Sequence, residues 1–399
     1  MQVSYIMKIK VFLILLALIP GILVAQTIKV ATFNVSMEAT NYQSLNMQPS
    51  ADVLAHVLAS GQHPQVRNIA EIIQRVDPDI ILLNEFDYIE DKSKGVDAFV
   101  KNYLNKPQSD QTPVNYPYTY VSSVNTGKPS PFDLDNNGKH TGYGGDAYGY
   151  GLYPGHYGMA LLSKFPIDEA AIRTFQHFKW QDMPHARAPR IPDENGNADN
   201  GKTWYSEEEW AALPLSSKSH WDIPIKVGIH TVHILAMHPT PPTFDGDEDR
   251  NGKRNADEIR LMADYLTPEK GAYVYDDSGA KVSLAAGSRF VLVGDFNAAD
   301  MGDKHRPGVI EQLLDSPLVN GNLVPVSAGG AAVSSEVFSN RFTAYWGARA
   351  DYVLPSQFGI KVIDTGVFWP EKTSGLHRLV NSRDASSDHR LVWAILSLH

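Results

Sequence analysis

The segment from Arg289 to Asp300 contains the clearest candidates for chemistry in this chain. Phe290 to Val293 is an uninterrupted apolar run, which predicts a strand buried on both faces. Asp295 and Asn297 follow directly, and a carboxylate is rarely buried without a partner. Asp295 can orient and deprotonate a water, and Asn297 can donate to a phosphate oxygen. An ordinary turn stabilised by Asp and Asn is the alternative interpretation.

Other predicted strands also end or begin at residues that suit chemistry rather than packing. Carboxylate and carboxamide oxygens, without thiolates, favour a hard cation such as Mg²⁺ or Mn²⁺. Two histidines with carboxylates nearby suit acid–base work and contact with an anionic phosphoryl group. We expect these side chains to gather at one mouth of a sheet: Asn34, Glu85, His238, Asp295, Asn297, Asp351, Asp388 and His389.

The elements that must position these residues follow an α/β pattern. Apolar positions between Ser50 and Arg75 recur at helical spacing, with a break at Gly61 and Pro64, and a further helix is predicted from Ile259 to Leu266. Irregular insertions near 125–155 and 176–222 interrupt the pattern. The second carries candidate cations for an anionic substrate, although each is also consistent with a solvated loop: Arg187, Lys218 and His220.

An acidic stretch before that helix matches the twelve-residue calcium-loop pattern. Gly252 stands at the sixth position and Glu258 at the twelfth, and the candidate ligands are Asp247, Asp249, Asn251 and Glu258. We therefore predict a structural Ca²⁺ separate from the catalytic cation. Against the pattern, no clear helix precedes the stretch, and the alternative is an acidic helix entry.

The charge and the N-terminal sequence indicate which partners and which cellular location to expect. Formal net charge is −10, which gives no generic attraction to duplex DNA and argues against that substrate, although a nuclease with a local basic site is compatible with it. Lys8 and Lys10 precede the apolar run 11–24, which predicts a signal peptide over residues 1–25 and a secreted or periplasmic protein. A retained anchor is the alternative, but the run is shorter than the roughly 20 apolar residues of a spanning helix. The chain has no cysteine, so disulfide bonds cannot stabilise its fold.

Six motifs in order along the chain resemble the endonuclease/exonuclease/phosphatase superfamily. They are Thr-Phe-Asn34, Leu-Leu-Asn-Glu85, Gly-Met-Ala-Leu-Leu-Ser-Lys-Phe-Pro-Ile, Val-Gly-Asp295-Phe-Asn297-Ala, Asp351-Tyr-Val-Leu and Ser-Asp388-His389. The resemblance implies an α/β fold, a four-layered α/β/β/α sandwich of two packed mixed sheets with helices outside. It also implies that residues 26–399 form a single catalytic domain, monomeric, with the two insertions.

The resemblance also implies a role for each residue. Glu85 is the main metal ligand, helped by Asn34 and Asp388. Asp295 activates or orients the water and Asn297 holds the phosphate, while Asp351 orients His389 against the phosphoryl oxygens. His238 is the candidate acid for the leaving group, although the sequence after it, Pro-Thr-Pro, departs from the family pattern.

We therefore predict an exported, metal-dependent phosphoesterase that cleaves a phosphodiester or phosphomonoester by in-line attack of water. We expect the substrate to be a small molecule, a phospholipid headgroup or a nucleotide. Specificity resides in loops that differ within a fold, so the family resemblance does not name the substrate. An extracellular nuclease is one alternative, and a non-catalytic binding protein on the same fold is another.

Overall fold

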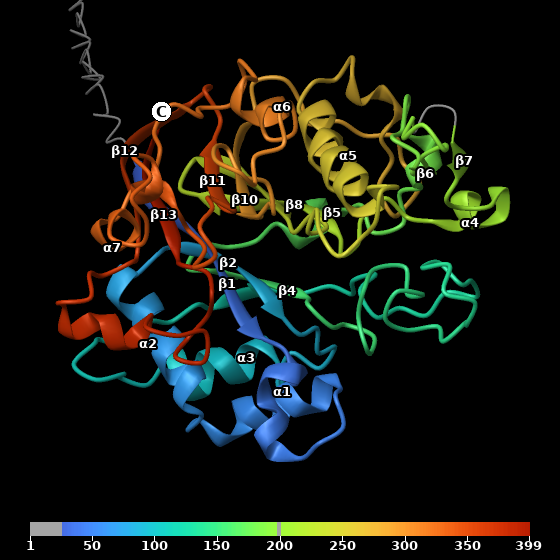
Figure 1. Cartoon of the computed structure of the whole chain (residues 1–399). Coiled ribbons are helices and arrows are strands. Elements are labelled where there is room, and N and C mark those ends of the chain that lie inside the picture. Colours follow the sequence, from blue (N-terminus) through green and yellow to red (C-terminus); the bar gives the residue numbers. More distant parts are fainter. Residues whose placement is uncertain (1–25, 198–200) are drawn as a thin grey trace, which may run out of the picture.

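The computed structural model describes residues 26–197 and 201–399 (Figure 1). The predicted signal peptide, residues 1–25, lies outside the described residues. Among the helices that are described, none has the length and apolar character needed to cross a membrane.

The first of two large sheets has six strands in the order β12-β13-β1-β2-β4-β3. β1 runs parallel to β2 and antiparallel to β13, so the N-terminal and C-terminal strands lie side by side at the centre of this sheet. The strands are β1 (Gln26–Met37), β2 (Ile80–Phe86), β3 (Tyr118–Tyr120), β4 (Met159–Ser163), β12 (Ile360–Val367) and β13 (Val392–Leu398).

The second sheet has five strands in the order β11-β10-β9-β8-β5. β9 and β10 are parallel, and β10 pairs antiparallel with β11 so that Asp295 faces Asp351 in register. The strands are β5 (Arg173–Thr174), β8 (His220–Val227), β9 (His230–Met237), β10 (Arg289–Asp295) and β11 (Asp351–Pro355). A separate ribbon pairs β6 (Arg190–Ile191) with β7 (Lys202–Thr203).

β10 is buried on both faces, as its apolar run predicts. Val291 and Val293 belong to the core between the two sheets, whereas Phe290 and Leu292 belong to a second core on the other face. The alternation follows from the two-residue period of a strand, whose successive side chains point to opposite faces. A strand buried on both sides is rigid, and it therefore fixes the position of the residues at its end.

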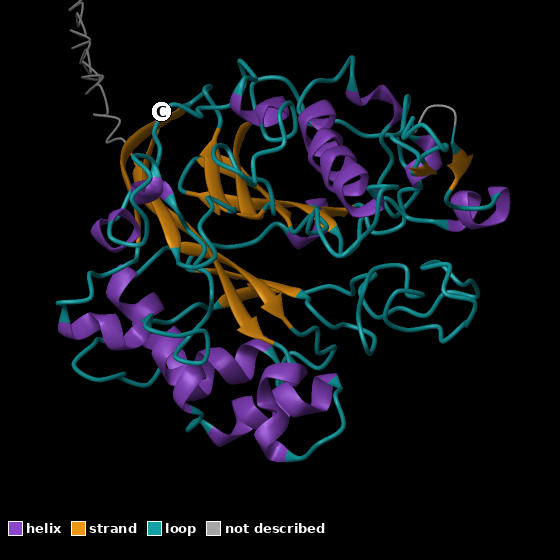
Figure 2. Ribbon diagram, viewed as in Figure 1, coloured by secondary structure: helices purple, strands orange, loops and turns teal. Residues whose placement is uncertain are grey.

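Helices cover the outer faces of both sheets, which gives a four-layered α/β/β/α arrangement (Figure 2). In Figure 1, α1 (Ala51–Ser60), α2 (Pro64–Val76) and α3 (Val96–Phe99) lie beside the first sheet, and α5 (Arg250–Tyr265) and α6 (Glu311–Leu314) lie beside the second. Gly61 ends α1 in the left-handed conformation and Pro64 opens α2, so the predicted break is real. The other short helices are Val100–Leu104, α4 (Glu207–Ala212), α7 (Ala328–Ala331), Ala39–Leu45, Glu169–Ala171, Trp180–Asp182, Gly271–Tyr273, Ser339–Arg341 and Gly375–Leu379.

Two elements differ from the sequence-based expectation. α5 begins at Arg250, nine residues before the predicted start at Ile259, because its first turns bury polar residues and lack the apolar spacing that marks a helix. His220, placed by the sequence in an irregular insertion, is the first residue of strand β8 and is fully buried.

Candidate active site

The strand ends bring the predicted residues to one mouth of the sandwich. Asn34 lies in β1 and Glu85 near the end of β2, while Asp388 and His389 precede β13, so the first sheet supplies these four. The second sheet supplies His238 after β9, Asp295 at the end of β10, and Asp351 at the start of β11. The mouth therefore lies where the two sheets meet.

Asp295 is the centre of this group. Asn34 Nδ2 donates to its Oδ2 at 3.1 Å, and the Nε2 atoms of His238 and His389 lie 3.5 and 3.6 Å from the same oxygen. The backbone amide of Asn297 donates to Oδ1 at 3.0 Å. Burial acts to raise the pKa of Asp295, but the charge of His389 and the contacts with His238 and Asn34 outweigh it and hold the pKa below its ordinary value. Asp295 is therefore ionised at neutral pH.

His389 is held in a chain of buried partners. Its Nδ1 lies 2.9 Å from Asp351 Oδ2, and Thr343 Oγ1 donates to the same oxygen at 2.7 Å. Burial lowers the pKa of His389, but the negative charges of Asp351 and Asp295 dominate and raise it to about 10. Burial raises the pKa of Asp351 to about 6. His389 therefore presents an oriented, positively charged ring next to Asp295.

His238 is in a different electrostatic state. Burial and the charge of Lys218 lower the pKa of His238 to about 4. Its ring is therefore neutral near pH 7, and its Nδ1 has no hydrogen-bond partner among residues 26–197 and 201–399. The role of leaving-group acid requires that a bound anion raise this pKa.

Glu85 and Asp388 are a second pair of interacting carboxylates at this mouth. Burial and the nearby negative charge of Asp388 raise the pKa of Glu85 to about 7, because the positive charge of His389 does not offset them. Ser36 Oγ donates to Asp388 at 3.2 Å. Oxygen donors with excess negative charge fit a hard divalent cation such as Mg²⁺. Glu85 has a φ of 54°, a left-handed conformation that a non-glycine residue adopts at some energetic cost.

Three other side chains at the mouth place possible ligand atoms close together. Those of Asp295, Asp351 and His389 all fall within 4.8 Å of one another, as a metal site requires. However, Asp351 and His389 are already bonded to each other, and His389 carries a positive charge. The geometry of this trio therefore also matches a hydrogen-bonded histidine–carboxylate pair beside a second carboxylate.

The backbone conformation at the end of β10 fixes the positions of Asp295 and Asn297. A Cβ on Gly294 would lie 1.9 Å from the carbonyl oxygen of Met237, so only glycine permits β10 to approach β9 here. Asn297 has a φ of 51°, and its Nδ2 donates to Pro239 O at 3.1 Å. That bond ties the segment after Asp295 to the segment after His238.

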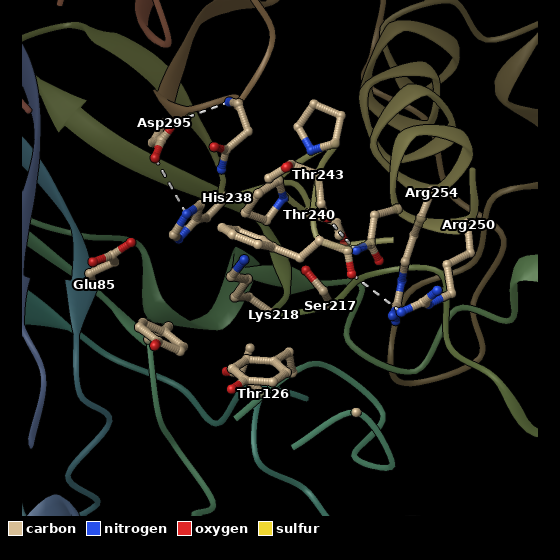
Figure 3. Close-up of a pocket in the computed structure, with 18 of the residues that line it drawn as sticks. Glu85, Thr126, Ser217, Lys218, His238, Thr240, Thr243, Arg250, Arg254 and Asp295 are labelled. Atoms are coloured by element: carbon tan, nitrogen blue, oxygen red, sulfur yellow. Dashed lines mark hydrogen bonds and ion pairs between the residues drawn. The ribbon is translucent and has the colours of Figure 1, made fainter. Parts of the chain in front are cut away.

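A cavity of about 1070 Å³ opens at this mouth. Figure 3 shows Glu85, His238 and Asp295 together with Lys218 around it. Of the predicted residues, Glu85, His238, Asp295, Asn297, Asp388 and His389 line the cavity, whereas Asn34 and Asp351 lie behind those they contact.

The three predicted substrate-binding cations have different positions. Lys218 lines the cavity. Arg187 does not, because its guanidinium pairs with the buried carboxylate of Asp257. His220 does not either: its Nδ1 contacts Ser216 Oγ, and burial lowers the pKa of its ring to about 3. The predicted substrate contact is therefore wrong in geometry for Arg187 and His220.

The predicted calcium loop is not formed. Asn251 and Glu258 belong to helix α5, and Asp249 pairs with Arg306. Glu258 is fully buried, and its two oxygens accept hydrogen bonds from the backbone amides of Ser217 and Thr240, at 2.7 and 2.6 Å. The residues Asp247, Asp249, Asn251 and Glu258 therefore do not form a twelve-residue loop. They lie at the start of α5 and within it, where Glu258 joins the segments of Ser217 and Thr240 by binding both backbone amides.

Substitution of Glu258 tests these two bonds. Glu258→Gln keeps the size but removes a charged acceptor of two buried amides, so we expect a loss of about 1.5–3 kcal/mol in the free energy of unfolding. Denaturant unfolding measures it, and the loss should be the same with and without Ca²⁺. Glu269→Gln, an exposed position, is the matched control. A loss seen only in the presence of Ca²⁺ would restore the calcium interpretation.

Sequence reasoning missed several residues of the site. Asn84 Oδ1 accepts a bond from the amide of Asp295 at 3.2 Å, and it lies inside the motif that ends at Glu85. Its place one residue from a candidate ligand is the only sequence signal. Thr343, which supports Asp351, lies in a segment without motif or period, so no such signal pointed to it.

Comparison with known proteins identifies the family. The model of the Endonuclease/Exonuclease/phosphatase family matches residues 31–389, so this chain belongs to that family. Its members are generally metal-dependent phosphoester hydrolases. No curated protein matches the chain.

Several solved structures are similar to this chain over most of its length, at low sequence identity. An endonuclease/exonuclease/phosphatase from Beutenbergia cavernae DSM 12333 is 16% identical with a TM-score of 0.48, over 93% of this chain and 72% of that chain. Sphingomyelinase C from Streptomyces griseocarneus is 14% identical with a TM-score of 0.47, over 94% and 100%. A beta toxin from Staphylococcus aureus with bound magnesium ions is 13% identical with a TM-score of 0.45, over 92% and 99%.

Proposed function

We propose that this protein is an exported, metal-dependent phosphoesterase that hydrolyses a phosphodiester or phosphomonoester by attack of an activated water. The observation that carries the proposal is the environment of Asp295. An ionised carboxylate lies between a charged and a neutral histidine, at the wall of a cavity that also holds an unbalanced pair of carboxylates. The export proposal rests on the N-terminal sequence alone.

In this proposal Glu85 and Asp388 hold the cation, with Asn34 behind them. The cation would supply a Lewis acid that polarises the phosphoryl oxygen and offsets its charge. Magnesium and manganese both suit oxygen ligands of this kind.

The remaining residues act on the water and the phosphoryl group. A carboxylate oxygen of Asp295 accepts a hydrogen bond from the attacking water and so orients it. The same carboxylate takes up the water's proton as the bond to phosphorus forms. His389, positively charged and oriented by Asp351, donates to a phosphoryl oxygen and stabilises the charge that develops there. Asn297 contributes a neutral donor, and His238 protonates the leaving alcohol once the bound anion has raised its pKa.

A substrate panel tests the proposal. Phosphomonoesters, phosphodiesters, phospholipids and DNA are each incubated with the chain in Mg²⁺, Mn²⁺, Ca²⁺ or chelator, and released product is measured. We expect hydrolysis of at least one phosphoester in Mg²⁺ or Mn²⁺, and its loss in chelator. Equal hydrolysis in chelator, or none of any phosphoester, would contradict the proposed function. Cleavage of DNA alone would make the protein a nuclease.

A further inference from the structure

Tyr157 is a residue of the cavity wall that the proposed mechanism does not use. It lies two residues before β4, which pairs antiparallel with β2, so it is beside the end of β2 that carries Glu85. Its side chain is partly exposed and lines the cavity. Among residues 26–197 and 201–399, no group forms a hydrogen bond with its hydroxyl, and that oxygen keeps accessible surface.

The backbone of Tyr157 is strained. Its φ is 55°, in the left-handed region, which is unusual for a residue with a bulky side chain. Glu85 and Asn297, two residues of the proposed mechanism, line the same cavity with φ values of 54° and 51°. Strained residues persist only where the surrounding structure holds them, and they concentrate at functional sites. The strain at Tyr157 is therefore a first indication of a role for its side chain.

Buried partners hold Tyr157 in this conformation. Its amide donates to Asp87 Oδ1 at 3.1 Å, and Asp87 follows Glu85 by two residues. Its ring stacks on the ring of His156, with centroids 3.6 Å apart and planes inclined by 16°. His156 is fully buried, and its Nε2 lies 3.0 Å from Glu38 Oε2. These contacts fix the ring of Tyr157 relative to Glu85.

The next residue brings the segment close to β2. The amide of Phe86 donates to Gly158 O at 3.1 Å, and a Cβ on Gly158 would lie 2.7 Å from Phe86 O. A side chain at this position would therefore push the segment away from β2. Glycine here allows Tyr157 to lie beside the end of that strand.

The hydroxyl of Tyr157 is a neutral hydrogen-bond donor. The ordinary pKa of a phenol is about 10, and burial together with the negative charges of Glu38 and Glu85 raises the pKa of Tyr157 further. Asp295 and Asp388 also line the cavity, so an anionic substrate needs donors to balance these carboxylates. A phenol that is already oriented supplies such a donor without rearrangement when the anion binds.

We propose that Tyr157 is a further catalytic residue, whose hydroxyl donates a hydrogen bond to a phosphoryl oxygen of the substrate. This inference rests on the proposed function and adds a contact to the same site. The hydroxyl keeps its proton throughout, so the proton transfers assigned to Asp295 and His238 are unchanged. The segment between the first insertion and β4 thereby takes a direct part in the reaction.

Removal of one oxygen tests the contact. Tyr157→Phe deletes the hydroxyl and keeps the ring that stacks on His156. We expect kcat/KM for the ester hydrolysed in the panel to fall about 10- to 100-fold, the range for a hydrogen bond to a charged group. The factor should be the same across the pH range in which the fold is retained, because the hydroxyl transfers no proton. Tyr150→Phe is the matched control: Tyr150 lines the same cavity but is 60% exposed, and kcat/KM should change less than about twofold.

A second substitution separates a chemical role from a structural one. Tyr157→Leu removes the hydroxyl and the stacked ring together, so it should lower both kcat/KM and the midpoint of thermal unfolding. Tyr157→Phe should leave the midpoint unchanged. If Tyr157→Phe retains the wild-type kcat/KM and only Tyr157→Leu loses activity, the ring has a structural role alone and the proposal is wrong. A loss in Tyr157→Phe that varies with pH would assign a proton transfer to Tyr157 and overturn the proposed contact.

Binding of inorganic phosphate separates this proposal from the proposed function. Calorimetry in Mg²⁺ compares wild type, Tyr157→Phe and Tyr150→Phe, and we expect binding to weaken about 10-fold or more in Tyr157→Phe alone. That result supports the contact even if no ester is hydrolysed. Equal binding in all three proteins, without a loss of kcat/KM in Tyr157→Phe, overturns the contact and leaves the proposed function intact. Wild type that binds no phosphate and hydrolyses no ester overturns both.

Discussion

Asp295→Asn should lower turnover by at least ~10²-fold, the lower end of the range for a group that transfers a proton. The substitution keeps the shape of the side chain but removes the charge that faces His238 and His389. Turnover on the substrate found in the panel is measured at saturating Mg²⁺, with circular dichroism to confirm that the fold is retained.

The control for this substitution is Asp303→Asn. Asp303 lines the same cavity, but its carboxylate is exposed, so the identical chemical change should alter turnover less than twofold. A folded Asp295→Asn variant with more than a tenth of the wild-type turnover would remove Asp295 from the mechanism.

His389→Ala should cause a loss of similar size, at least ~10²-fold. The substitution deletes the charged ring that Asp351 orients and leaves the carboxylates of Asp295 and Asp351 without their shared cation. Because it also leaves a ring-sized space, added imidazole should restore part of the turnover.

His305→Ala is the matched control, since His305 lines the same cavity but pairs with Glu311 away from Asp295. We expect little change in turnover and no response to imidazole. If His389→Ala and His305→Ala behave alike, the role proposed for His389 is wrong.

The strands that end at the candidate site could be predicted because a buried strand has a recognisable apolar pattern in the sequence. β10 is packed on both faces, so its residues are apolar without interruption, and the polar residues at its end stand out. The family resemblance then supplied the order in which such strand ends come together. The fold class was predicted correctly on these grounds.

The start of α5 could not be predicted, because its buried face is polar. Asn255, Asp257 and Glu258 are fully buried through hydrogen bonds and ion pairs, which leave no apolar periodicity. Glu258, with Asp247, Asp249, Asn251 and Gly252, also matched the spacing of a calcium loop. A spacing pattern cannot distinguish oxygens aimed at a cation from oxygens aimed at backbone amides.

The junction between the two sheets has a consequence for the proposed activity. Asn34 and Asn84 of the first sheet bond to Asp295 of the second, so the carboxylate proposed to activate water is aligned by contacts between the two sheets. If the sheets slid by a fraction of a residue, each would keep its own ladder of hydrogen bonds while the alignment was lost. Turnover should therefore respond to small changes in the relative position of the two sheets. On gentle heating, we expect activity to disappear before the far-ultraviolet circular dichroism of the strands changes.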